Sequence, residues 1–485
     1  MENKKHFYIT TTLPYVNATP HIGFALEIIK ADAIARYKKQ QGFEVFFNTG
    51  TDEHGQKIYQ TALELNKTPQ EYCDELAKVF IQLKQKLNLS FNSFIRTTDE
   101  KHIKGAAEFW NLCLKNGYIY KGKYKVKYCV GCELEKQDSD LVDNRCPLHP
   151  NLELQINEEE NYYFKFSAFQ KPLLDLYKNN PKFVLPEFRL REMESFVKNG
   201  LQDFSISRLK SKMPWGINVP NDDNHVMYVW FDALINYISC LGFPDTTGDY
   251  KKYWPGTQIC GKDNLRQQSA MWQAMLMAAG LQNSTQILVE GFINSNGQKM
   301  SKSLGNTVDP FELTEKYGID ALRYYLLAEF PAFGDDGDYT FEKFKQRVNG
   351  DLANGIGNLV ARVTKMCETG GFSLKLKVKR EKFEDLEKRL EDLMDDYRID
   401  ETLVLFREEV TKLDKEIQLK KPWENLESSK EFLEITLNKI LNILNLFSWV
   451  LPTTHERVWE ELGISEKGDF TGRIKVVTGL FPRIS

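Results

Sequence analysis

Two short stretches, far apart in the chain, carry side chains that could bind a polyphosphate. His21 and Gly23 follow a strand-like segment and lie where a helix is expected to begin. Free backbone N–H groups and the dipole at a helix N-terminus attract phosphate, and a glycine lets a bulky ligand approach the main chain. The alternative is a turn in which the histidine only caps the helix.

The second stretch contains Lys299, Ser301 and Lys302, and it follows the flexible segment 294–297. Two lysines and two hydroxyls within five residues of a mobile loop could neutralise the charge that develops when pyrophosphate leaves a nucleotide. Taken alone, the stretch could equally be a solvated basic loop.

A third group is typical of a metal centre. Two residues separate Cys129 from Cys132, and two residues separate Cys146 from His149. Three thiolates and one imidazole suit tetrahedral zinc. Since protein atoms would fill all four positions, we expect one structural Zn2+ ion rather than a catalytic one. The alternative is a set of unconnected core cysteines with a surface histidine.

The elements that must position these groups alternate between strand and helix in the first third of the chain. Strands are predicted at 7–10, 44–48 and 91–96, and helices at 24–41, from Pro69 onward and at 100–116. This alternation predicts an α/β fold with a Rossmann-like, doubly wound parallel sheet. Ligands bind beyond the carboxyl ends of such strands, which is where His21 falls.

The alternation stops at Tyr118 and resumes near Met227, with strands predicted at 258–260 and 286–289, so we expect an inserted domain between them. From about Phe341 the apolar residues follow a helical period, interrupted by a lysine-rich connector at 375–382. The expected boundaries are 1–117 and 226–300 for the two halves of the Rossmann domain, 118–225 for the insertion, 301–345 for the lysine loop and the connecting region that follows it, and 346–485 for an all-α bundle.

Composition narrows the class of protein. The 64 basic and 68 acidic residues give a net charge of −4, which excludes a strongly basic nucleic-acid coat protein but leaves room for a local basic patch. The eight cysteines are too few for a disulfide framework and indicate a reducing compartment. The start has no signal-peptide pattern, and the apolar stretch 440–451 is too short to cross a bilayer. We therefore expect a cytoplasmic protein with no membrane partner.

Together, the His-Ile-Gly stretch at 21–23 and the Lys-Met-Ser-Lys-Ser stretch at 299–303 resemble the class I aminoacyl-tRNA synthetases. Further stretches look specifically like the methionyl-tRNA synthetases; these are residues 13–15, 50–55, 228–233, 261–263 and 303–306. The resemblance implies ATP-dependent ligation of L-methionine to tRNA(Met), including the initiator, through methionyl-adenylate, with release of AMP and diphosphate. It also implies Mg2+ bound with ATP, a zinc knuckle in the insertion and an anticodon-binding C-terminal bundle.

The resemblance implies roles for individual residues. Those that match the methionine pocket are Leu13, Tyr15, Asp52, Trp230, Ala233, Tyr237 and Gln268, with Asp52 holding the substrate ammonium. Those that match the ATP site are His21, Gly23, Gly261, Asp263, Lys299, Ser301 and Lys302; the catalytic set is His21, Lys299, Lys302 and Arg208. The spacing of Trp230, Ala233 and Tyr237 would place them on one helical face, which is also the pattern of an ordinary core stripe.

Two positions depart from the family pattern. Phe24 stands where the family usually has a second histidine, and a phenylalanine can neither donate a hydrogen bond nor carry charge. Losing one such transition-state contact typically costs about 2.7–4 kcal/mol. Gln267 and Gln268 replace an aromatic–histidine pair beside the methionine pocket, and an amide does not titrate.

The resemblance assigns anticodon reading to Asn358, Arg362 and Trp423. The first two could hydrogen-bond an exposed base edge while Trp423 stacks on a base. The alternative is a surface ion pair at Arg362 and simple packing of Trp423.

Two other functions stay open at this stage. A cysteine-specific relative would bring the substrate sulfur to zinc, whereas we expect the Cys129 cluster to lie away from the pocket. A tRNA-binding paralogue without catalysis is suggested by Phe24. We expect a monomer, since no appended dimer-forming domain is visible in the sequence.

Overall fold

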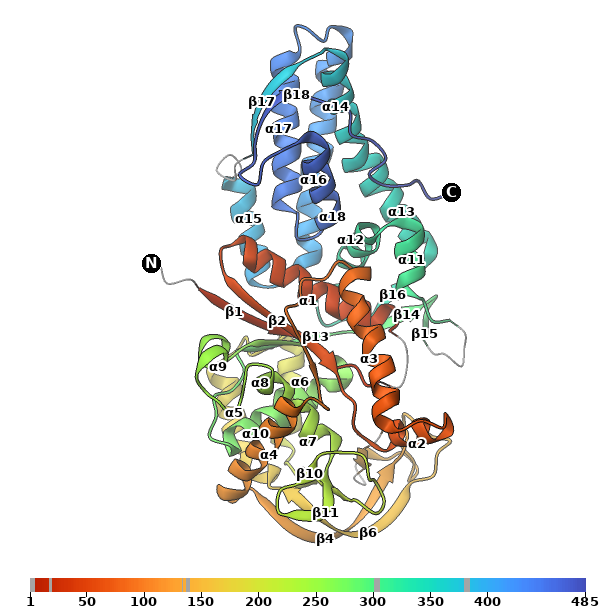
Figure 1. Ribbon diagram of the computed structural model, residues 1–485, viewed down its shortest axis with the longest axis vertical. Helices are drawn as coiled ribbons and strands as arrows, with labels where there is room; N and C mark the ends of the chain where they lie inside the picture. The colour runs from red at the N-terminus through yellow and green to blue at the C-terminus, as the bar shows by residue number, and fades with distance from the viewer. Residues whose placement is uncertain (1–4, 17–19, 133, 137–139, 301–305, 379–383) are drawn as a thin grey trace.

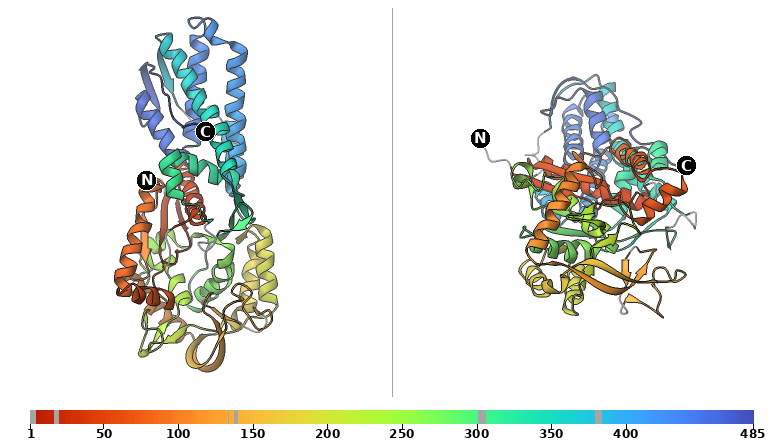
Figure 2. Two further views of the ribbon diagram at one scale, coloured as in Figure 1. Left: turned by 90° about the vertical axis from the view of Figure 1, so that its right-hand side faces the viewer. Right: turned by 60° about the horizontal axis from the view of Figure 1, so that its bottom comes forward.

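The computed structural model describes residues 5–16, 20–132, 134–136, 140–300, 306–378 and 384–485. The molecule is elongated, with a parallel sheet near its middle, a helical region at one end and long antiparallel strands at the other (Figure 1). The same arrangement is visible from the side, where the helical region extends along the long axis (Figure 2).

The central sheet has six strands in the order β3-β2-β1-β12-β13-β7, and every neighbouring pair is parallel. Their bounds are His6–Thr10 (β1), Glu44–Thr51 (β2), Ser93–Arg96 (β3), Val184–Leu185 (β7), Thr257–Gly261 (β12) and Gln286–Glu290 (β13). From β1 the sheet continues through β2 and β3 on one side and through β12 and β13 on the other, with β7 added at the far edge, which confirms the predicted doubly wound fold. The direction of winding reverses between β1 and β12, and that is where such sheets bind ligands.

Neighbouring residues of a strand pack into different hydrophobic clusters, because successive side chains point to opposite faces of the sheet. Tyr8 packs in one apolar cluster and Ile9 in the other, and the same division separates Cys260 from Ile259. One cluster is covered by α1 (Ile22–Gln40), α3 (Pro69–Lys86) and α12 (Ile319–Glu329); the other by α4 (Glu100–Lys115), α8 (Asn236–Ser239) and α10 (Trp272–Ala278).

Local signals explain where these helices begin and end. Thr68 and Glu71 form a reciprocal capping box at the start of α3, and Pro69 occupies its first turn. Gly42 follows α1 with φ of 86°, a conformation that glycine adopts without strain. These signals agree with the helices that the sequence predicts at 24–41 and from Pro69 onward.

The segment 118–225 forms a four-stranded antiparallel sheet in the order β5-β4-β6-β8, whose long strands β4 and β6 form the far end of the molecule (Figure 1). It also contributes β7 to the edge of the central sheet, which the sequence did not predict. The elements are β4 (Ile119–Cys129), β5 (Leu134–Lys136), β6 (Gln155–Phe164), η2 (Phe166–Phe169), α5 (Gln170–Asn179), α6 (Glu187–Lys198), β8 (Phe204–Ser205), β9 (Ser207–Leu209), β10 (Asn218–Val219) and β11 (Asp222–Met227).

The remaining elements connect the sheet to the helical end of the molecule. Around the sheet lie α2 (Gln56–Glu64), α7 (Val229–Leu234), α9 (Gly248–Tyr253), η3 (Lys262–Asn264), η4 (Gln267–Met271), β14 (Ile293–Ser295), β15 (Gln298–Lys299), α11 (Pro310–Tyr317) and β16 (Gly337–Tyr339). The helical end contains α13 (Phe341–Arg347), η6 (Val348–Gly357), α14 (Asn358–Thr369), α15 (Glu384–Asp395), α16 (Ile399–Lys420), η8 (Pro422–Glu424), α17 (Lys430–Leu446) and α18 (Pro452–Leu462).

One prediction in the helical region is wrong. Part of the expected lysine-rich connector is strand β17 (Ser373–Lys377), which pairs antiparallel with β18 (Asp469–Arg473). Leu374 and Leu376 are buried while the residues between and beside them are exposed, a period of two that only a strand produces. Across the described residues, no helix combines the length and apolar character that crossing a bilayer requires.

Candidate active site

A cavity of about 600 Å³ lies at the point where the winding of the central sheet reverses. Its wall is built from the segments that follow β1, β2, β12 and β13, together with the N-terminus of α1 and helices α7 and α8. Eleven of the residues that the sequence assigned to substrates line it: Leu13, Tyr15, His21, Gly23, Asp52, Trp230, Ala233, Tyr237, Gly261, Asp263 and Gln268.

One side of the cavity is apolar and ends in a buried phenol. Trp230 and Ala233 come from α7 and Tyr237 from α8, so the predicted helical spacing does present them together. Gln268 donates a hydrogen bond to the Tyr237 hydroxyl and accepts one from Gln258 Nε2 at 3.0 Å. Burial raises the pKa of Tyr237 well above its ordinary value, so the hydroxyl keeps its proton.

Asp52 reaches the opposite wall because a short parallel bridge pairs it with Tyr15 beyond the ends of β1 and β2. The Asp52 N–H donates to Pro14 O at 3.0 Å, and Val16 N–H donates to Asp52 O at 3.2 Å. Since both main-chain groups of Asp52 are bonded, its carboxylate has a fixed origin at the cavity wall. A carboxylate in this position can pair with a substrate ammonium.

The group suited to binding phosphate lies at the start of α1. His21 is the N-cap residue, and its Nδ1 accepts from Gly23 N–H at 3.0 Å. A Cβ on Gly23 would lie 2.8 Å from His21 Cε1, so this cap requires glycine. Because Nδ1 is an acceptor, a neutral imidazole carries its proton on Nε2. Capping and a role toward a ligand are therefore compatible.

Phe24 also lines the cavity, where its ring packs edge-on against Phe80 with centroids 5.7 Å apart. The sequence missed three charged residues of the same wall, which are Glu27, Lys57 and Glu290. Lys57 comes from α2. Glu27 comes from α1, accepts from Thr12 N–H at 2.7 Å, and has its pKa raised by burial and then by nearby Glu290. No spacing rule links residues 27 and 57 to the stretches at 13–24 and 50–55.

Four of the predicted site residues are not among the described residues that line the cavity. Arg208 is not among the residues that line the described cavity: its Nη1 donates to Ser205 Oγ and Ser207 O, both at 2.8 Å, and its guanidinium lies 4.3 Å from the Tyr228 ring centroid. The backbone of Lys299 pairs with Asn294 in the β14–β15 hairpin. Ser301 and Lys302 lie outside the described residues.

The predicted metal ligands do come together. One ligand atom each from Cys129, Cys132, Cys146 and His149 lies within 4.8 Å of the others, with Cys132 Sγ 3.4 Å from Cys146 Sγ and 3.2 Å from His149 Nδ1. A Cβ at residue 131 would lie 2.4 Å from His149 Cδ2, so Gly131 is required for this approach. Three sulfurs and one imidazole at such distances fit tetrahedral zinc.

The expectation that this cluster lies away from the pocket is wrong. Gly131 and Cys132 are part of the cavity wall, because the turn between β4 and β5 reaches the cavity mouth. All four ligand positions are nevertheless protein atoms, so zinc here would have no coordination position left for a substrate sulfur.

In the helical region, Arg362 and Trp423 line a second, open hollow of about 450 Å³. The Arg362 guanidinium carbon is 6.0 Å from the Trp423 ring centroid, and its Nη1 pairs with Asp414 Oδ1 at 2.6 Å. Trp423 is 47% exposed, which leaves its face accessible. Asn358, the first residue of α14, is not among the residues that line this hollow.

The split parallel sheet, the switch-point cavity with its histidine-capped helix and the appended helical region agree with the resemblance to the class I aminoacyl-tRNA synthetases. The model of the family described as tRNA synthetases class I (M) matches residues 7–151 and 132–364. The chain belongs to this family, the methionyl-tRNA synthetases.

Individual relatives and a solved structure support the same family assignment. The chain is 41% identical to a methionine–tRNA ligase of Thermotoga maritima over 483 residues, which is 95% of this chain and 76% of the relative. It is 47% identical to that of Thermosynechococcus vestitus over 368 residues, 75% of this chain and 69% of the relative. A structure of Mycobacterium tuberculosis methionyl-tRNA synthetase in complex with methionyl-adenylate superposes with a TM-score of 0.91 at 35% identity, covering 99% of this chain and all of the other.

Proposed function

We infer that this protein ligates L-methionine to tRNA(Met) with ATP, through methionyl-adenylate, and releases AMP and diphosphate. The observation that carries the inference is the switch-point cavity, which combines a carboxylate at Asp52, an apolar wall ending in Tyr237, and the capped N-terminus of α1 at His21. Those three features suit an ammonium, a thioether side chain and a phosphate, respectively.

The first reaction step joins the amino acid to the nucleotide. A methionine carboxylate oxygen attacks the α-phosphorus of ATP in line, and the bond from that phosphorus to pyrophosphate breaks. We propose that Asp52 holds the ammonium and that His21 Nε2–H and the α1 N-terminus hold phosphate oxygens. Lys299, Ser301 and Lys302 are proposed to offset charge on the departing pyrophosphate, and Mg2+ enters bound to ATP.

In the second step a terminal ribose hydroxyl of tRNA attacks the carbonyl carbon of the adenylate, and AMP leaves. No covalent enzyme intermediate is needed, so catalysis comes mainly from positioning and electrostatic stabilisation. Arg208 is kept as a candidate for the reacting phosphate or carboxylate only if its segment moves, because its described contacts hold it among Ser205, Ser207 and Tyr228.

We further propose one structural zinc ion at the Cys129 cluster, anticodon reading by Asn358, Arg362 and Trp423, and a monomeric, cytoplasmic enzyme. We also propose the domain boundaries that the sequence predicts. One strand of the segment 118–225, β7, nevertheless forms the edge of the central sheet.

Methionine-dependent exchange of labelled pyrophosphate into ATP tests the activation step, and charging of tRNA(Met) tests the transfer. We expect exchange with methionine and none with cysteine. Binding of tRNA without exchange for any amino acid would instead support the non-catalytic paralogue that Phe24 suggests.

A further inference from the structure

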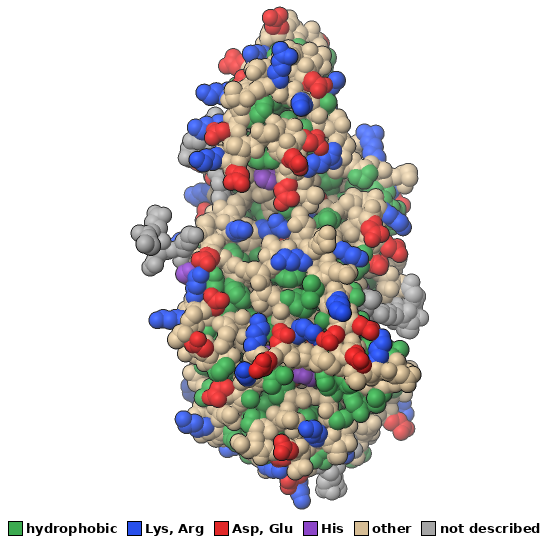
Figure 3. Space-filling model, in the orientation of Figure 1, with side chains coloured by type: hydrophobic (Ala, Val, Ile, Leu, Met, Phe, Trp, Pro, Cys, Tyr) green, Lys and Arg blue, Asp and Glu red, His purple; other side chains and the backbone are tan. Residues whose placement is uncertain are grey.

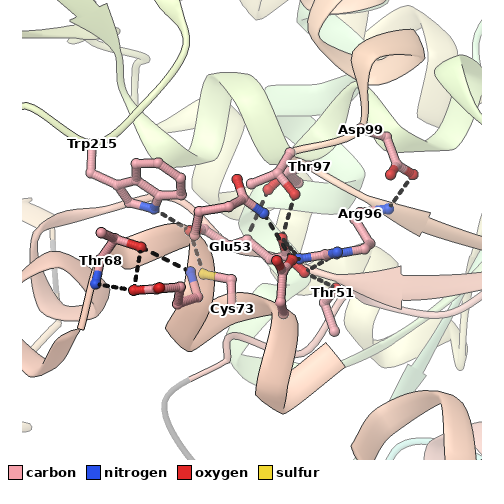
Figure 4. A network of polar contacts seen from close by, with 12 residues as sticks. Thr51, Glu53, Thr68, Cys73, Arg96, Thr97, Asp99 and Trp215 are labelled. Atoms are coloured by element: carbon pink, nitrogen blue, oxygen red, sulfur yellow. Dashed lines mark hydrogen bonds and ion pairs between the residues drawn. The ribbon is translucent and has the colours of Figure 1, made fainter. Parts of the chain in front are cut away.

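Glu53, the residue directly after Asp52, is the centre of a network of hydrogen bonds (Figure 4). Glu53 is fully buried and is not among the residues that line the cavity. Its carboxylate accepts from Arg96 Nε at 2.7 Å and Nη2 at 2.9 Å, from Thr51 Oγ1 at 2.7 Å and from Thr98 Oγ1 at 2.5 Å. A buried carboxylate with four such bonds has one stable orientation.

The main chain of Glu53 is held as well. Its N–H donates to Thr97 Oγ1 at 2.9 Å, and its carbonyl oxygen accepts from Trp215 Nε1 at 2.6 Å (Figure 4). The N–H belongs to the peptide group that follows Asp52 directly. The orientation of that peptide group sets where the Asp52 side chain starts.

Trp215 reaches this loop from a distant part of the chain. It lies between β9 and β10 in the segment 118–225, and its half-buried ring packs against the core on the α1 side of the sheet. The ring also meets His54 edge-on, with centroids 5.5 Å apart, and His54 Nδ1 lies 2.6 Å from Asp232 Oδ2.

Asp232 extends the connection to the other wall of the cavity. It lies in α7, two residues after Trp230 and directly before Ala233. It is fully buried and also pairs with His102 Nε2 at 2.8 Å. Trp215 thus contacts two consecutive residues: Glu53, which directly follows Asp52, and His54, which is bonded to Asp232 of α7.

We propose that Trp215 and Thr97 are positioning residues for methionine binding, with Trp215 giving the segment 118–225 direct control over the geometry of Asp52. Neither residue lines the cavity. Both act through the main chain of Glu53, so their loss changes how well the ammonium is held rather than how the nucleotide is bound. This inference rests on the proposed function.

The test compares Trp215→Phe, which keeps an aromatic ring but lacks the N–H, with Thr97→Val, which is nearly isosteric and lacks the hydroxyl. Trp254→Phe is the matched control, because Trp254 Nε1 also donates to a main-chain oxygen, Gln282 O at 2.9 Å, and does not line the cavity. The KM for methionine, the KM for ATP and kcat are measured by pyrophosphate exchange, with the thermal midpoint of each variant.

We expect each of the first two variants to raise the KM for methionine about three- to tenfold, the range that loss of one hydrogen bond produces. The KM for ATP and the kcat at saturating methionine stay within twofold of wild type, and Trp254→Phe changes none of the three. If Trp215→Phe does not fold, Thr97→Val decides.

A wild-type KM for methionine in the folded variants overturns the inference. So does an equal rise in the KM for methionine and ATP, which would indicate general loosening. Exchange activity in the wild-type enzyme separates these results from failure of the proposed function, because an inactive wild type would overturn that function first.

Discussion

At the scale of single residues, the cavity is lined by the amide of Gln268 at a position where the family resemblance implies a histidine. Gln268 bonds both Tyr237 and Gln258 in an interior that is almost inaccessible to solvent. A histidine there would change its charge near neutral pH, whereas a glutamine does not. The hydrogen bond from Gln268 to the Tyr237 hydroxyl therefore does not depend on the protonation state of residue 268.

Gln268→Leu should lower kcat/KM for methionine about tenfold, because it removes the donor to the Tyr237 hydroxyl and the acceptor of the Gln258 Nε2–H in the interior. Pyrophosphate exchange at varied methionine concentration measures this. Gln286→Leu is the control, since its amide bonds Lys182 O at the surface. Equal loss in the two variants would contradict a specific role for Gln268.

Asp52→Asn keeps the shape of the side chain and removes its charge. We expect kcat/KM for methionine to fall at least a hundredfold, because an ammonium buried without its counter-charge costs about 3–5 kcal/mol. The KM for ATP should change little. Calorimetric binding of methionine checks the result without turnover, and an unchanged affinity would remove Asp52 from the ammonium site.

Sequence reasoning placed His21 after β1 from the strand pattern, and the residues that follow β2 and β12 from the family resemblance. It missed Glu27, Lys57 and Trp215, whose approach to the cavity depends on how helices and a distant loop pack. Neither hydrophobic period nor residue spacing encodes such packing.

At the scale of elements, the end of β4 and the turn that follows it carry the metal ligands Cys129 and Cys132, and the turn also borders the cavity. Only the folded path of β4 brings them together. The strand β17 was missed for a simpler reason: the lysines flanking Leu374 and Leu376 obscured a short two-residue period.

Removal of zinc by a chelator should lower the thermal midpoint by several degrees, because the four ligands would lose the ion that holds them together. Exchange activity should fall in parallel, since Cys132 borders the cavity. Differential scanning fluorimetry with and without chelator measures the first effect, and added Zn2+ should reverse it. Unchanged stability and activity would contradict a structural zinc.

Trp423→Ala should weaken tRNA charging about ten- to a hundredfold while sparing methionine activation, because stacking on an aromatic side chain contributes about 1–3 kcal/mol per base. The KM for tRNA in aminoacylation, set beside pyrophosphate exchange, measures the difference. Trp459→Ala, a tryptophan of α18 outside the hollow, serves as the control. Equal loss in both assays would remove Trp423 from the anticodon site.

At the scale of the whole molecule, acidic and basic side chains are interspersed over the face shown in Figure 3, in line with a net charge of −4. A fully buried ion pair joins the sheet domain to the helical region. Arg323 of α12 pairs with Asp32 of α1 at 2.8 Å and donates to the carbonyl oxygens of Trp449 and Val450, before α18.

Arg323→Met should lower the free energy of unfolding by about 3–5 kcal/mol, because Asp32 would lose its main buried partner. Chemical denaturation measures it. Burial raises the pKa of Asp32, but Arg323 and Arg36 outweigh burial and hold that pKa below its usual value. The stabilisation is therefore present above the ordinary pKa of about 3.9 and lost as the pH falls below it, and a variant as stable as wild type at pH 7 would contradict this role.

The order of strands in the central sheet also constrains synthesis on the ribosome. β1 pairs with β2 on one side and with β12 on the other, so one edge of the earliest strand lacks its neighbour until Gly261 has been translated. At about 5–20 residues per second, that interval is roughly 13–50 s. Throughout it the nascent chain carries an exposed strand edge, a surface that favours wrong pairing and chaperone capture.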